Sequence, residues 1–171
     1  MIIKPPLVDA INGQIRNEFS ASSQYIAIAV YFDDAGLPDL AAFFYRQSAE
    51  ERDHAMKMVH FLLETGARPV IPDLPAVQNE FGGAAEAVEL ALTQEIKVTE
   101  QINDLVTLAT RHDDHTSNNF LQWFVMEQVE EVDSMSTLLS TIKHAGGNLL
   151  LVEEFVRRTS AAGAEGGEAA D

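Results

Sequence analysis

The feature that most constrains the fold is an apolar stripe interrupted by a glutamate and a histidine. Steps of four and three along residues 40–61 place on one helix face Leu40, Phe44, Gln47, Glu51, His54, Met58 and Phe61. Glu51 and His54 lie three positions apart, so both side chains project from that face. A carboxylate buried alone is strongly unfavourable, and these groups therefore need a compensating charge. A metal cation would supply it.

The same kind of stripe recurs in three other stretches, residues 8–29, 88–109 and 121–142. Their polar interruptions near mid-length are Glu18, Glu95, Gln128 and Glu131. In an antiparallel bundle, mid-length positions lie at one level, so these groups should converge with Glu51 and His54. The separation of 33 positions between Glu18 and Glu51 recurs between Glu95 and Gln128. The pattern predicts two related halves and a two-metal centre in an all-α four-helix bundle.

Glycine and proline residues set the predicted bounds of the helices. The helices are expected over 5–34, 38–65, 84–110, about 119–145 and, as a short fifth helix, about 148–159. Arg111 to Asn118 is interpreted as a polar turn. Residues 67–83 lack a helical period and contain three prolines, which predicts a long crossover between the second and third helices.

Composition narrows the class of protein. A net charge of -16 argues against a nucleic-acid-binding surface, and the absence of cysteine excludes disulfides, iron–sulfur clusters and a thiol nucleophile. Neither a signal-peptide core nor an apolar run of membrane-spanning length is found. We therefore expect a cytoplasmic protein without a membrane or nucleic-acid partner. One domain should occupy residues 1–159, followed by a disordered acidic tail over 160–171.

The ligand types indicate which metal the centre would bind. A carboxylate-rich set with one imidazole and open positions suits iron or manganese, with zinc as a competitor. Iron is preferred because two ferrous ions bridged by carboxylates can jointly reduce dioxygen. Tyr25 follows Glu18 by two turns on the same face, where it could donate a hydrogen bond or an electron. Taken singly, a glutamate or histidine on such a stripe is more often structural. Polar interruptions at the same height of four apolar stripes together favour a metal-binding site.

Several motifs together resemble the non-haem bacterial ferritins, over about residues 5–159. They are Asn17-Glu18 followed by Tyr25, Glu50-Glu51-Arg52-Asp53-His54-Ala55, Gln94-Glu95, and the run from Phe120 to Gln128. The resemblance implies a ferritin-like four-helix bundle with a short fifth helix, assembled into a hollow 24-subunit shell. It also implies oxidation of ferrous iron by dioxygen or hydrogen peroxide and storage of ferric iron as an oxyhydroxide mineral.

Site residues carried over from the resemblance form a ferroxidase centre and an adjoining acidic site. The first iron site would have Glu18, Glu51 and His54, and the second Glu51 and Glu95, with Gln128 alongside. The additional acidic site would comprise Glu50, Glu127, Glu130 and Glu131, the last of these shared.

Two departures separate this chain from other ferritins. Bacterioferritins, which bind haem, have methionine where this chain has Arg52 and a second Glu-x-x-His motif in the fourth helix, so no haem is expected. Animal ferritins have two acids early in the fourth helix that line an iron channel, where this chain has Asn118 and Leu121. His112 and His115 are interpreted as parts of a solvated loop, with a lesser alternative as a channel or surface metal site.

Two other functions remain open from the sequence. One is a small dimeric di-iron oxidase or peroxidase that stores no mineral. The fifth helix and the additional acidic cluster favour storage over it, because a minimal di-iron enzyme needs neither. The other is a metal-free bundle that acts only in protein interaction, which would require six polar groups inside the stripes to be satisfied without a cation.

Overall fold

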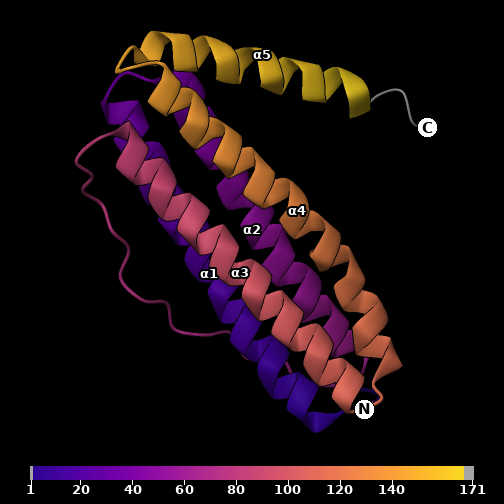
Figure 1. Ribbon diagram of the computed structural model, residues 1–171. Coiled ribbons are helices and arrows are strands. Elements are labelled where there is room, and N and C mark those ends of the chain that lie inside the picture. The colour runs from indigo at the N-terminus through magenta and orange to yellow at the C-terminus, as the bar shows by residue number, and fades with distance from the viewer. Residues whose placement is uncertain (1, 168–171) are drawn as a thin grey trace.

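The computed structural model describes residues 2–167 of the chain as five α-helices joined by loops. Their bounds are Pro5–Asp34 (α1), Pro38–Glu64 (α2), Ala84–Arg111 (α3), His115–His144 (α4) and Leu149–Gly167 (α5). Figure 1 shows α1 to α4 side by side as a bundle, with α5 across one end. The all-α fold predicted from the sequence is confirmed.

The segment between α2 and α3 crosses the length of the bundle, as predicted (Figure 1). Polar side chains of α1 hold it in place. The side-chain oxygen of Asn12 accepts the backbone N–H of Val70 at 2.7 Å, and Gln24 exchanges two hydrogen bonds with the backbone of Gln78 at 2.7 and 2.8 Å. Because an extended segment has few hydrogen bonds of its own, these contacts satisfy part of its backbone.

The core of the bundle consists of two apolar clusters at different heights. One contains Tyr25, Phe32, Phe44 and Met135, and the other contains Ile15, Met58, Ile102 and Phe124. Along each of the helices α1 to α4, the polar residues that interrupt the apolar stripe lie between the residues of one cluster and the residues of the other. The sequence pattern therefore places a polar layer between two apolar halves of the core.

Two predicted helix bounds were wrong. α4 begins at His115 rather than after Asn118, because Asp114 caps it by accepting the backbone N–H of Ser117 at 3.0 Å. α5 continues past the predicted end at Thr159 as far as Gly167, so residues 160–167 are helical where a disordered tail was expected. The last part of that predicted tail, 168–171, lies outside the described residues.

Among the helices of the described region, none combines the length and the apolar character needed to cross a lipid bilayer.

Candidate metal centre

Each helix of the bundle contributes at least one side chain to the polar layer. α1 supplies Glu18 and Tyr25, α2 supplies Glu51 and His54, α3 supplies Glu95, and α4 supplies Gln128 and Glu131. All seven are at most 5% exposed. Because of the helical period, the polar residues of four separate stripes meet in one buried cluster.

Three groups of potential ligands overlap in this cluster. They are Glu18, Glu51 and His54; Glu51, Glu95 and Glu131; and His54, Glu127 and Glu131. Within each group the ligand atoms lie within 4.8 Å of one another. Glu51 belongs to the first two groups, which is the arrangement required of a carboxylate that bridges two ions.

Hydrogen bonding leaves specific oxygens free. Within the described part of the chain, Oε2 of Glu18 and both carboxylate oxygens of Glu51 are buried and have no hydrogen-bond partner apart from a proton that the two carboxyl groups can share. The nearest cationic candidate is His54, whose Nδ1 atom lies 3.7 Å from Oε2 of Glu51. Buried polar atoms are normally satisfied, so unpartnered carboxylate oxygens that converge on one point favour a cation there.

Burial and mutual repulsion raise the pKa values of the carboxyl groups. Burial is the largest cause for Glu18, followed by the charge of Glu51, and both raise its pKa well above the usual range. Burial, followed by the charge of Glu95, does the same for Glu51. The pKa of Glu131 rises to about 8, mainly through burial and the charge of Glu95. Without a cation, the cluster therefore retains protons that metal binding would displace.

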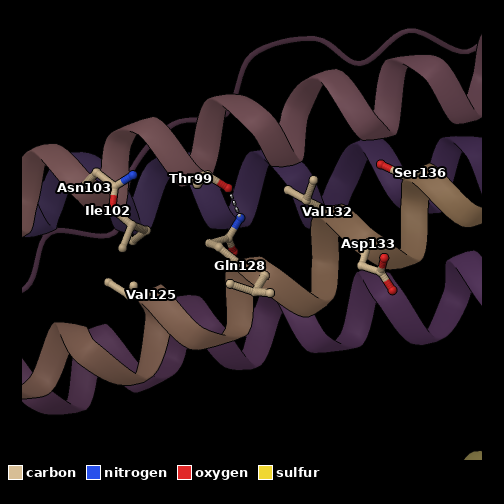
Figure 2. A pocket seen from close by; sticks show the side chains of 9 residues that line it. Thr99, Ile102, Asn103, Val125, Gln128, Val132, Asp133 and Ser136 are labelled. Atoms are coloured by element: carbon tan, nitrogen blue, oxygen red, sulfur yellow. Dashed lines mark hydrogen bonds between the residues drawn. The ribbon is translucent and has the colours of Figure 1, made fainter.

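Glu95 is the most strongly hydrogen-bonded carboxylate of the layer. Its Oε1 atom accepts from the Tyr25 hydroxyl, and its Oε2 atom accepts from Nε2 of Gln128 at 3.1 Å. Gln128 also contacts the hydroxyl of Thr99 at 3.3 Å, at the side of a groove of about 550 Å³ between α3 and α4 (Figure 2). Apolar side chains such as Ile102 and Val125 line much of this groove.

Aromatic rings flank the imidazole of His54. Trp123 and Phe124 meet it edge to face, with ring centroids 5.4 and 5.9 Å away. The amino group of Lys57 lies 4.0 Å from the centroid of the Trp123 ring. Because such contacts restrict rotation of the imidazole, its ring is held in place before any metal binds.

Of the four residues of the additional acidic site, only Glu127 and Glu131 belong to a group of potential ligands. Glu127 joins His54 and Glu131, while Glu50 is exposed and accepts a hydrogen bond from Gln47. Glu130 is exposed, belongs to none of the three ligand groups, and lines a groove against α5 instead.

Two side-chain contacts at the layer were not predicted. Gln14 donates a buried hydrogen bond to Glu18, and Gln47, on the stripe of α2 as predicted, donates one to the exposed Glu50. Their spacings of four and three positions on a helix are the signals that could have indicated both.

Comparison with known proteins gives a consistent result. Residues 8–145 match the family described as Ferritin-like domain. The chain is 51% identical over 156 residues to Ferritin BfrB of Mycolicibacterium smegmatis, covering 91% of this chain and 86% of that protein. It is 33% identical over 145 residues to the bacterial non-heme ferritin of Staphylococcus saprophyticus, covering 85% of this chain and 87% of that protein.

Solved structures agree with the sequence relatives. A humanized archaeal ferritin superposes with a TM-score of 0.88 at 34% identity, covering 90% of this chain and 95% of the other. An open-pore ferritin from Archaeoglobus fulgidus superposes with a TM-score of 0.87 at 32% identity, covering 91% of this chain and 96% of the other. Both the family match and the relatives extend over most of the bundle. The chain therefore belongs to the ferritin family.

Proposed function

We propose that this protein stores iron, and that it oxidises ferrous iron at the polar layer before storage. The observation that carries the proposal is the pair of ligand groups that share Glu51, with both Glu51 oxygens free. The first group, with Glu18 and His54, suits one ferrous ion, and the second, with Glu95 and Glu131, suits another. The family membership supports iron as the substrate.

The residues of the centre would act by position and charge. Negative carboxylates draw in two ferrous ions and hold them close enough to give one electron each to the same oxidant, dioxygen or hydrogen peroxide. Ionised carboxylates also offset the additional positive charge of the ferric products. Tyr25 and Gln128 hold the two oxygens of Glu95 by donating to them.

Storage of the oxidised iron needs an enclosed volume, which a single bundle lacks. We propose a shell of 24 copies around an oxyhydroxide mineral, supported by the resemblance to ferritins. The test is aerobic loading with ferrous iron followed by size-exclusion chromatography with protein and iron measured in each fraction. A large particle with far more iron than its ligands could hold supports storage. A small oligomer with about two ions per chain would indicate a di-iron oxidase or peroxidase instead.

The role of the centre is tested by the double variant Glu51→Ala and His54→Ala. We expect it to lose rapid ferrous oxidation and anaerobic binding of ferrous iron. The matched control is His60→Ala with Glu64→Ala, which removes the same residue types from exposed positions of α2. If the Glu51/His54 variant handles iron like the unmodified protein, the metal-free bundle becomes the better description.

A further inference from the structure

Gln14 is a buried amide beside the metal centre that the proposed reaction has not used. It lies one turn before Glu18 on α1 and is 2% exposed. Its Nε2 atom donates a hydrogen bond to Oε1 of Glu18 at 2.8 Å. Its own oxygen accepts from Nδ2 of Asn17 at 3.0 Å. Because Asn17 occupies the acceptor end of the amide, the donor end is directed at Glu18.

This chain of hydrogen bonds gives Glu18 a hydrogen-bonding pattern different from those of Glu51 and Glu95. Glu51 has two free oxygens and Glu95 has two that accept hydrogen bonds, whereas Glu18 has one of each. A carboxylate with both oxygens free can bridge two ions. A hydrogen-bonded oxygen keeps a further lone pair, as the ligand role of Glu95 requires, so the donor on Oε1 of Glu18 orients that carboxylate and leaves Oε2 as its fully free oxygen, which suits a single ion.

We propose that Gln14 is a positioning residue that holds Glu18 as a one-oxygen ligand through Oε2, and that Asn17 fixes the direction of the Gln14 amide. The proposal rests on the proposed function, because it concerns the same centre. Neither amide touches the ion itself. They act through Glu18, as partners outside the ligand shell orient the ligands of other metal sites.

The alternative is that Gln14 only satisfies buried polar groups of α1. Gln24 provides the comparison, because it is a glutamine on the same helix, is 6% exposed, and bonds to the backbone of Gln78 rather than to Glu18. Methionine at either position keeps nearly the same length and removes the amide. Only the change at Gln14 should alter metal binding.

The experiment uses Co²⁺, which binds carboxylate and imidazole ligands without being oxidised under anaerobic conditions. Assembled protein is titrated with Co²⁺ while its visible absorption reports both occupancy and coordination. We expect Gln14→Met to weaken binding of the first ion about ten- to a hundredfold and to change the absorption band. Asn17→Ala should change the Co²⁺ affinity and the absorption band in the same direction, but by a smaller amount. Gln24→Met should have the affinity and the absorption band of the unmodified protein.

A double-mutant cycle separates positioning from a general structural effect. If Gln14 acts through Glu18, then Gln14→Met has no further effect on Co²⁺ affinity once Glu18→Ala is present. Equal effects in both backgrounds, or unchanged Co²⁺ binding by Gln14→Met, would overturn the proposal. If Gln14→Met does not assemble, Asn17→Ala, at a half-buried position, takes its place in the same cycle. Failure of the proposed function looks different, because Glu18→Ala alone would then leave Co²⁺ binding unchanged.

Discussion

The Tyr25 hydroxyl donates a hydrogen bond to Oε1 of Glu95, and both side chains are completely buried. Burial, followed by the negative charge of Glu95, raises the pKa of Tyr25 well above its usual value, so the phenol keeps its proton and remains a donor. This contact links α1 to α3 inside the polar layer. It holds one oxygen of a carboxylate that is proposed to bind iron.

Tyr25→Phe should slow ferrous oxidation without abolishing metal binding. The change leaves Oε1 of Glu95 without its donor and removes the phenol from the layer, so we expect an initial rate about tenfold lower. Stopped-flow absorbance after mixing with ferrous iron in air measures that rate. Tyr45→Phe is the control, because the Tyr45 hydroxyl contacts Asp33 on the exposed side of the bundle. An unchanged rate for Tyr25→Phe would show that the hydroxyl has no part in oxidation.

The metal-free protein should lose stability as the pH rises from 5 to 9. Glu131 has a pKa of about 8 in the folded protein, mainly because of burial, against about 4.3 for an unfolded glutamate. Between these values the folded state binds more protons than the unfolded state, so the free energy of unfolding decreases with increasing pH. Above about 8 this contribution is fully lost.

Thermal unfolding midpoints across this pH range measure the effect. Glu131→Gln should reduce the slope, and Glu100→Gln, at an exposed position of α3, should leave it unchanged. Saturating Co²⁺ should reverse the trend, because the ion binds the ionised carboxylates and displaces their protons. A slope that is the same with and without Glu131 would contradict this explanation.

The sequence predicts the fold and most of the polar layer because both depend on one local period. An interruption at the same height of each stripe identifies Glu18, Glu51 and Glu95 without any long-range information. The start of α4 was missed although Asp114 is a local N-cap residue that bonds to Ser117, because the polar run from Arg111 to Asn118 was interpreted as a turn. What the helical period could not show is the second partner of Asp114, the backbone N–H of Lys4, 110 positions away. Contacts between distant segments leave no trace in a helical period, so the sequence could not show them.

Asp114 should stabilise the protein at neutral pH and cease to do so in acid. Burial alone would raise its pKa, but the N–H groups of Ser117 and Lys4 outweigh burial and lower it below the usual value. The folded state therefore favours the ionised form. This stabilisation is present above the unfolded pKa of about 3.9 and is lost as the pH falls through the lower folded value.

Asp114→Asn tests this assignment through its pH dependence. The variant should be less stable by about 1 kcal/mol at pH 7, and the difference should shrink below about pH 4. The control is Asp113→Asn, at an exposed position where φ is +50° and asparagine is well tolerated. Thermal unfolding at both pH values provides the comparison. A difference that does not change with pH would assign the effect to packing rather than to charge.

Glu153 of α5 caps the beginning of α2. Its two carboxylate oxygens accept the backbone N–H groups of Asp39 and Leu40 at 2.9 and 2.7 Å, and the side chain is 8% exposed. The N-terminus of α2 has no cap from its own segment, so these bonds satisfy donors that would otherwise be unpartnered. The negative charge also interacts favourably with the helix dipole. The contact fixes α5 to the helix that carries Glu51 and His54.

Glu153→Gln should therefore destabilise the end of the bundle where α5 lies. A glutamine has one acceptor oxygen and no charge, so one N–H loses its partner and the expected loss is about 1–3 kcal/mol. Glu154→Gln is the control, because the neighbouring carboxylate pairs only with the exposed side chains of Arg157 and Arg158 among the described residues.

Limited proteolysis at the link between α4 and α5, residues 145–148, measures how often α5 detaches. Faster cleavage in Glu153→Gln than in Glu154→Gln is expected, since only the first change removes a bond between α5 and α2. Equal cleavage rates would mean that apolar contacts of α5, such as those of Val152 and Val156 in the core, hold it without the cap.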